Sequence, residues 1–224
     1  MSFPNSFLIY KPKDIVAGDF YWHFKTDKNV YFAIADCTGH GVPGALVSVI
    51  CHNALDTVVN RNKEIDPGSI LDEVKTIITN TFSNSGKHIN DGMDISLIKY
   101  DFKKQKLLWA GANNPLWQLS ADNMLEVYKA NKQPVGNFEK GVAFTTHQIN
   151  FKKGDSFYLF TDGFSDQFGG ENDKKFKTAN FKKLVIDLNN SSMAHQKTEI
   201  ENTFENWKLK VDQVDDVAIF GFVL

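Results

Sequence analysis

The stretch Asp36-Cys37-Thr38-Gly39-His40-Gly41-Val42-Pro43-Gly44-Ala45 decides how the fold of this sequence is interpreted. The apolar run Tyr31-Phe32-Ala33-Ile34-Ala35 before it predicts a buried strand, and the apolar residues after it predict a helix that begins near Pro43. Carboxylate and backbone oxygens gathered by a tight turn are the ligands that a hard cation prefers. A plain strand-to-helix turn explains the same Asp and Gly residues. Taken alone, the stretch favours the plain turn, and the rest of the sequence changes that balance.

A second carboxylate is expected beside Asp36. Residues 19–24 and 30–35 have the character of strands, and the segment between them is rich in turn residues, so they predict a β-hairpin. Because the first residue of a hairpin lies opposite its last, Asp19 and Asp36 should lie at the same end of the pair. Two adjacent carboxylates repel each other unless a proton or a cation lies between them. Gly18, just before Asp19, is expected to allow a bulge or a close approach.

The remaining sequence predicts an α+β fold. Helices are expected over residues 45–59, from Pro67, over 181–188 and over 194–209, and further strands over 94–100, 106–110, 115–119, 125–128, 142–151, 156–160 and 215–222. Short strands joined by short turns are typical of antiparallel sheets. No linker divides the 224 residues, so we expect one domain over residues 1–224.

Aspartate recurs at the ends of the predicted strands. Asp162 follows a buried run and precedes Gly163, and Asp215 and Asp216 begin the last strand. Each residue singly is explained by turn chemistry. Together with Asp19 and Asp36 they form an all-carboxylate set without Cys or His ligand spacing, which favours magnesium or manganese over zinc. The number of carboxylates suffices for two ions, and a binuclear centre of this kind is suited to the hydrolysis of a phosphate ester.

Charge and composition exclude other classes. The formal net charge of −2 argues against a general nucleic-acid or anionic-membrane surface. Arg61 is the only arginine, so phosphate recognition by guanidinium groups is nearly excluded. Cys37 and Cys51 do not form a disulfide framework and are expected to be free thiols in a reducing cytoplasm. No apolar run approaches the length of a membrane span. We therefore expect a cytoplasmic protein, or the cytoplasmic domain of a larger one.

Six motifs occur in an order that points to a known family. They are Ala17-Gly18-Asp19-Phe20-Tyr21, Ala35-Asp36-Cys37-Thr38-Gly39-His40-Gly41-Val42-Pro43, Ala110-Gly111-Ala112-Asn113-Asn114-Pro115, Pro134-Val135-Gly136, Leu159-Phe160-Thr161-Asp162-Gly163 and Asp215-Asp216. With them the chain resembles the stage II sporulation protein E (SpoIIE) branch of the protein phosphatase 2C (PPM) superfamily. The resemblance covers nearly the whole chain. It implies a four-layer αββα sandwich, with two central antiparallel sheets flanked by helices.

The resemblance also implies a set of ligands for two manganese or magnesium ions. Asp36 would bridge the two ions, and the backbone carbonyl of Cys37 would be a further ligand. Asp19 and Asp162 would bind the ions from the hairpin and the later strand. Asp215 occupies the ligand position of the final motif, and Asp216 is the less favoured alternative.

His40 aligns with the histidine proposed as the general acid of the superfamily, which protonates the leaving serine oxygen. A proton donor that titrates near neutral pH suits this role. A histidine hydrogen-bonded within its own turn is an equally weighted alternative. Three residues depart from the family pattern: Ala17 for glycine, Ala112 for histidine and Ala218 for threonine or serine. None of them removes an expected metal ligand.

The implied function is metal-dependent hydrolysis of phosphoserine or phosphothreonine on proteins. The expected substrate is a phosphorylated anti-sigma-factor antagonist in a bacterial partner-switching pathway, with no nucleic acid and no direct membrane contact. A homodimer stays open. So does an N-terminal sensor domain in the native protein, because the resemblance implies a branch that commonly carries such domains, and the chain would then be an excised phosphatase domain. One alternative is a metal-binding signalling module of the same fold with weak or no turnover. A phosphatase of small molecules is another, and a deep pocket would favour it.

Overall fold

The computed structural model describes residues 3–83, 91–138 and 141–224. In chain order the elements are β1 (Ser6–Lys11), β2 (Phe20–Lys25), β3 (Asn29–Cys37), α1 (Gly41–Arg61), α2 (Pro67–Ser83), β4 (Gly92–Asp101), β5 (Lys106–Ala112), β6 (Leu116–Leu119), β7 (Leu125–Tyr128), β8 (Val135–Gly136), β9 (His147–Ile149), β10 (Ser156–Phe160), α3 (Gly163–Asp166), β11 (Phe168–Gly169), β12 (Lys174–Lys175), α4 (Thr178–Asp187), α5 (Met193–Lys208) and β13 (Val217–Val223).

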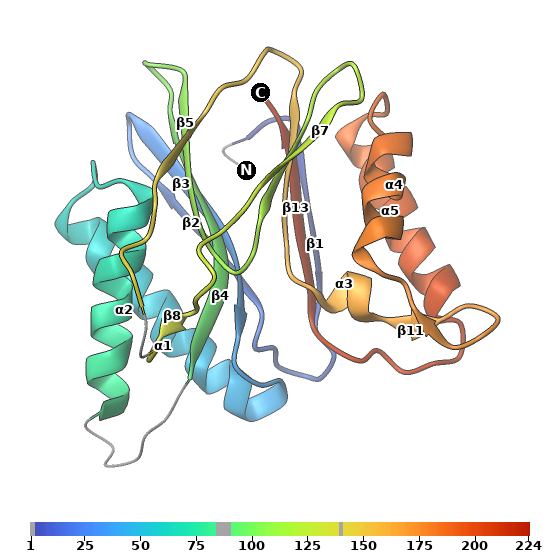
Figure 1. Cartoon of the computed structure of the whole chain (residues 1–224), viewed down its shortest axis with the longest axis horizontal. Helices are drawn as coiled ribbons and strands as arrows, with labels where there is room; N and C mark the ends of the chain where they lie inside the picture. Colours follow the sequence, from blue (N-terminus) through green and yellow to red (C-terminus); the bar gives the residue numbers. More distant parts are fainter. Residues whose placement is uncertain (1–2, 84–90, 139–140) are drawn as a thin grey trace.

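Two antiparallel sheets form the centre of the molecule. One has the strand order β2-β3-β4-β5-β9, with β8 paired to β4, and the other has the order β1-β13-β10-β6-β7. Helices α1 and α2 cover the outer face of the first sheet, and α4 and α5 cover the outer face of the second (Figure 1). The predicted four-layer αββα arrangement is therefore confirmed.

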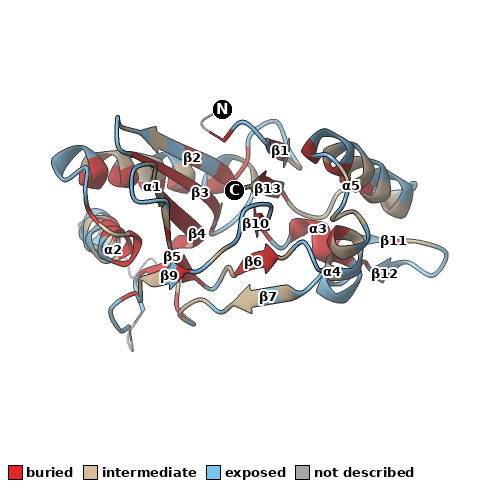
Figure 2. Cartoon of the chain, turned by 90° about the horizontal axis from the view of Figure 1, so that it is seen from above, coloured by how far each residue is buried: buried red, intermediate tan, exposed pale blue. Residues whose placement is uncertain are grey.

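Strand β3 shows why the central strands are apolar throughout. Its residues Tyr31, Ala33 and Ala35 pack against α1 and α2, whereas Phe32 and Ile34 pack between the two sheets. Both faces of the strand are buried, so the apolar run does not alternate with polar residues. Buried residues accordingly line the inner strands of both sheets (Figure 2).

The predicted strand over residues 142–151 is wrong in length, because only His147–Ile149 pairs as β9. The preceding backbone donates its N–H groups to side chains instead of to a strand. Val142 N donates to Gln133 Oε1 at 2.9 Å, Phe144 N to Asp72 Oδ1 at 3.1 Å, and Thr145 N to Asn131 Oδ1 at 3.0 Å. The short elements β8, α3, β11 and β12 were not predicted, since two to four residues carry no periodic signal.

Helix α1 is long and apolar enough, by length and composition alone, to cross a membrane, and it is the one such helix in the described ranges. Its residues Val47, Cys51, Leu55 and Val58 are buried against the first sheet and α2. One face of α1 thus packs in the core, whereas Val42, Leu46 and Val49 on the helix are exposed.

Candidate active site

The first sheet gathers three carboxylates at one end. Phe20 pairs with Ala35 in the β2–β3 hairpin, which places Asp19 and Asp36 at the same end, as the sequence predicts. Strand β3 does not stop at Asp36, because Asp36 pairs with Asp94 of β4 and Cys37 pairs with Met93. Asp94 is thus a third carboxylate beside the other two. None of the sequence motifs includes Asp94, because only the register between β3 and β4 brings it there.

The second sheet contributes two more carboxylates from its facing end. Phe160 of β10 pairs with Ile219 of β13, so Asp162 follows β10 at the edge where Asp215 precedes β13. Gly163 is required here, because a Cβ atom at this position would collide with the backbone carbonyl of Asp216. The negative charges of Asp162 and Asp215 act on Asp36, so the carboxylates of the two sheets lie near one another at this end.

Burial and mutual repulsion raise the pKa values of these groups. Burial raises the pKa of Asp19 to about 9, and the negative charge of Asp36 adds to the shift. Burial likewise raises the pKa of Asp36 to about 7, with contributions from Asp162 and Asp215. The pKa values of Asp94 and Asp162 are also raised, chiefly by burial. A carboxylate cluster with this electrostatics binds protons or cations readily.

Asp19 is a buried member of the cluster with an unpaired oxygen among the described residues. Its exposed fraction is 3%, and its Oδ2 atom is buried without a hydrogen-bond partner among the described residues. A buried carboxylate oxygen without a partner is costly, so it calls for a proton or a positive ion. In the described parts of the chain, no group of three or more His, Cys, Asp or Glu side chains already surrounds one point as metal ligands do. The donor chemistry fits a hard divalent cation, and the side chains would have to close around it.

Asp216 differs from Asp215 in how its carboxylate is used. Asp216 is buried, and its two oxygens accept the backbone N–H groups of Lys13 and Gly18 at 2.7 Å each and of Asp19 at 3.4 Å. It therefore anchors the segment that leads to Asp19. Asp215 is half-buried, and its Oδ1 accepts the backbone N–H of Asp216 at 2.9 Å. This contrast favours Asp215 over Asp216 as a ligand.

Glycines build the turn that follows Asp36. Gly39 and Gly41 have φ values of +86° and +64°, which L side chains rarely adopt. The carbonyl oxygen of Gly39 lies so close to Gly18 and Gly44 that a Cβ atom on either residue would collide with it. The close approach predicted at Gly18 is thus confirmed. It packs the segment before Asp19 against the turn after Asp36.

Cys37 offers a carbonyl and not a thiolate. Its backbone oxygen lies 3.3 Å from the position that a Cβ atom on Gly18 would take, and so lies next to the segment of Asp19. Its side chain points into the core, where a hydrogen bond with Cys51 and burial raise the thiol pKa well above its usual value. Both cysteines are buried and free, which confirms the expected absence of a disulfide between them.

His40 caps the N-terminus of α1 without a side-chain hydrogen bond to its own turn. Its Nδ1 lies 3.3 Å from Asp14 Oδ2, and its Nε2 lies 3.3 Å from Lys13 Nζ. The imidazole is exposed and is contacted by the segment that Asp216 anchors. The sequence analysis missed Lys13 and Asp14, because they are distant from His40 along the chain. Arg61 lies at the opposite end of α1, about 30 Å away at 1.5 Å per residue.

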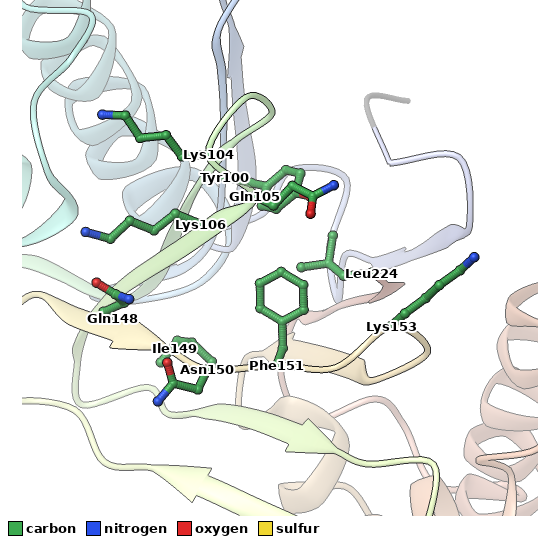
Figure 3. Close-up of a pocket in the computed structure, with 10 residues that line it drawn as sticks. All are labelled: Tyr100, Lys104, Gln105, Lys106, Gln148, Ile149, Asn150, Phe151, Lys153 and Leu224. Atoms are coloured by element: carbon green, nitrogen blue, oxygen red, sulfur yellow. The ribbon is translucent and has the colours of Figure 1, made fainter.

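A cavity of about 680 Å³ lies at the other end of the sheets (Figure 3). It is lined by Tyr100 at the end of β4, by the β4–β5 turn and by the C-terminal Leu224. Strand β4 runs from the acidic cluster at Asp94 to this cavity. None of the five clustered aspartates lines it.

Comparisons with known proteins agree with this architecture. Phosphoserine phosphatase RsbU of Bacillus subtilis (strain 168) is 23% identical over 159 residues, which are 69% of this chain and 44% of RsbU. The chain thus spans less than half the length of this curated relative. The SiaA-PP2C domain of Pseudomonas aeruginosa has a TM-score of 0.89 at 29% identity, over 98% of this chain and 86% of that chain.

RsbX, solved in complex with magnesium, shares the fold with a TM-score of 0.66 at 18% identity, over 98% of this chain and 94% of that chain. The structure therefore has the protein phosphatase 2C fold, as the sequence motifs imply. A profile of the family described as Stage II sporulation protein E (SpoIIE) matches residues 26–222. This match covers most of the sequence, and the chain belongs to the SpoIIE family.

Proposed function

We propose that the chain is a metal-dependent protein serine/threonine phosphatase that hydrolyses phosphoserine or phosphothreonine. The observation that carries this proposal is the buried, unpartnered Asp19 oxygen within a cluster of carboxylates whose pKa values are raised. Such a cluster is stabilised when divalent cations bind, and the carboxylate donors fit two Mn²⁺ or Mg²⁺ ions. Family membership and the name of RsbU support the reaction class.

Each residue then has a role. Asp36 of β3 would hold the metal ions together with Asp19, Asp162, Asp215 and the Cys37 carbonyl. Asp216 would position Asp19 by holding the backbone of the segment before it. The chemistry that two divalent ions would supply at these residues is the activation of a water molecule for hydrolysis of a phosphate ester.

His40 would complete the reaction as general acid. The bond between phosphorus and the serine oxygen breaks as the bond to the water oxygen forms, and His40 donates a proton to the departing serine oxygen. Asp14 contacts the Nδ1 side of the imidazole and would orient it. Lys13 places a positive charge beside the Nε2 side, where it would also attract the phosphate.

A phosphorylated protein is the proposed substrate. RsbU is named a phosphoserine phosphatase, which supports a phosphoserine protein in bacterial partner-switching signalling, of the anti-sigma-factor antagonist type. The corresponding place of action is the cytoplasm, either as a free domain or as the cytoplasmic part of a sensor phosphatase. The exposed apolar residues Val42 and Leu46 at the start of α1 lie close to His40 in sequence and would contact a folded partner.

The decisive test compares Asp36→Asn with the wild type in hydrolysis of p-nitrophenyl phosphate with manganese. Loss of a bridging ligand removes several kcal/mol of transition-state stabilisation, so we expect turnover to fall at least about 100-fold. Asp101→Asn, at the other end of β4, is the matched control and should retain full turnover. Equal turnover in Asp36→Asn and the wild type would contradict the proposed mechanism.

The same proteins distinguish an enzyme from a metal-binding signalling module. Manganese at about 100 times its Kd adds about 2.7 kcal/mol to the free energy of unfolding, which corresponds to roughly 5–10 °C in Tm. We expect this shift in the wild type and a much smaller one in Asp36→Asn. A full Tm shift without hydrolysis of p-nitrophenyl phosphate or of a phosphopeptide would favour the signalling module.

A further inference from the structure

Asp94 is a carboxylate at the acidic end that none of the six sequence motifs includes. It lies directly opposite Asp36 in the register of β3 and β4. Side chains in such cross-strand pairs are about 5 Å apart at their Cβ atoms, and like charges in this position destabilise a sheet. Asp94 is half-buried, so water reaches its carboxylate only in part.

Asn113 orients this carboxylate. Its Nδ2 donates to Asp94 Oδ1 at 2.8 Å, while its own backbone N–H donates to Asn131 O at 2.9 Å. Asn113 has a φ of 54°, in the left-handed region that asparagine tolerates better than most residues. An amide orients a carboxylate without neutralising it. The hydrogen bond from Asn113 therefore fixes the position of Asp94 Oδ1, and the carboxylate keeps its negative charge.

Asp101, on the same strand, shows what a purely structural aspartate does. It accepts the backbone N–H groups of Lys103 and Lys104 at 2.9 and 2.8 Å and closes the β4–β5 turn. Among the described residues, the donor to the Asp94 carboxylate is a side-chain amide and not a turn N–H group. Turn formation thus does not account for Asp94.

The surroundings of Asp94 point to a cation. Asp36 lies on the same face of β3 as Phe32 and Ile34, which pack between the two sheets, and its cross-strand neighbour Asp94 therefore also faces the second sheet. Independently, Asp19, which is more than nine-tenths buried and lies at the same end of the hairpin as Asp36, has an oxygen without a hydrogen-bond partner among the described residues. A cation at this place would offset the repulsion between Asp36 and Asp94 and would also give the Asp19 oxygen a partner.

We propose that Asp94 is a further carboxylate of the metal centre and that Asn113 is its positioning residue. This inference rests on the proposed function. The Asp94 carboxylate adds a negative charge beside Asp36. This charge increases the affinity of Asp36 and Asp162 for a divalent cation. Partners of ligating residues at metal centres typically change the affinity 10- to 100-fold when they are removed, which sets the size of the effect.

The test measures manganese binding to metal-free protein by isothermal titration calorimetry. We expect Asp94→Asn to raise the Kd for manganese at least about 10-fold, because the amide keeps the shape and removes the charge. Asn113→Gly keeps the backbone conformation and should raise the Kd by a smaller factor. Asp101→Asn is the matched control on the same strand and should bind manganese like the wild type.

Stability of the metal-free proteins separates this role from a structural one. Asp94→Asn should not lower the urea midpoint of metal-free protein, because it removes a charge that its neighbours repel. An unchanged manganese Kd in Asp94→Asn would overturn the inference while leaving the proposed function intact. A wild type that binds no manganese would overturn both, so the two failures are distinguishable.

Discussion

Asp94 and Asp101 lie at opposite ends of strand β4 and behave in opposite ways. Backbone N–H groups of the β4–β5 turn lower the pKa of Asp101, with the N–H of Lys104 contributing most. Burial raises the pKa of Asp94. At one end of the sandwich the Asp101 carboxylate is hydrogen-bonded by its own turn, and its pKa is lowered. At the other end the Asp94 carboxylate lies opposite another carboxylate, and its pKa is raised. The difference comes from what each end supplies: N–H groups and lysines at one, further carboxylates at the other.

The surroundings of the two ends repeat this contrast. The cavity at the Asp101 end is lined by Lys104, Lys106 and Lys153; the first two extend to one side of the view and Lys153 to the other (Figure 3). At the Asp94 end, five aspartates from both sheets face one region. The charges that gather at one end are therefore negative, and the charged side chains that line the cavity at the other end are lysines. The predictions below test whether activity and pH dependence belong to the acidic end alone.

The largest effect is expected from His40→Ala with a phosphoserine peptide as substrate. A serine oxygen is a poor leaving group and needs the proton, so turnover should fall about 100-fold or more. p-Nitrophenolate leaves without a proton, so hydrolysis of p-nitrophenyl phosphate should fall far less. Parallel assays of kcat on the two substrates check this. An equal decrease on both would assign His40 to binding or folding instead of proton transfer.

Gly163→Ala should combine a stability loss with a loss of activity. Its Cβ would meet the Asp216 carbonyl, and overpacking of this kind costs about 1–3 kcal/mol and would displace the neighbouring Asp162. Gly154→Ala is the counterpart at the other end, where a Cβ meets no atom within 4 Å but φ is +97°. Its backbone strain costs about 1–2 kcal/mol. Urea denaturation should show comparable losses, and the assay should show inactivation in Gly163→Ala alone.

Metal-free protein should lose stability as the pH rises. Asp36 and Asp19, with pKa values of about 7 and about 9, stay protonated in the folded state at pH values where the unfolded chain has lost these protons. The unfolded state then binds fewer protons, so the free energy of unfolding falls between about pH 4 and pH 9. Urea titrations with a chelator at pH 5, 7 and 9 measure this. Asp19→Asn should flatten the upper part of the curve, and a rise in stability over this range would contradict the assignment.

The smallest effect is expected from Arg61→Ala. Arg61 lies at the far end of α1, so its removal should change turnover less than about twofold, within the range of ordinary surface substitutions. Lys13→Ala removes a cation that contacts His40 and should lower turnover clearly more. Steady-state kinetics on a phosphopeptide rank the two. A larger loss in Arg61→Ala would place phosphate recognition elsewhere.

Much of the fold could be predicted because its signals are local. The run 31–35 is apolar throughout, and the glycines after Asp36 specify a turn, so strand, turn and helix were all predicted in this order. Hairpin geometry correctly placed Asp19 beside Asp36, since a short turn leaves a single pairing. The exception was the segment before β9, where side chains of distant residues take the backbone N–H groups.

The candidate site was predictable only in part. Strand-end aspartates can be recognised by their positions in the sequence, and the clustering of Asp19, Asp36, Asp162 and Asp215 at one end agrees with that prediction. The side chains that act on them could not be found in this way. Lys13 and Asp14 reach His40 from a segment held by Asp216, which lies about 200 residues away by the numbering.

The sequence by itself determined the class of fold, the family motifs and the acidic character of the site, because these follow from periodicity, turn residues and residue type. Only the tertiary structure decided which aspartates are satisfied and which are not. Asp94 and Asp216 are the same residue near strand ends, yet backbone N–H groups of the distant residues Lys13 and Gly18 bind the carboxylate of Asp216, whereas Asp94 lies opposite another carboxylate. That distinction depends on strand register and on the packing of two sheets, which no local stretch of sequence contains.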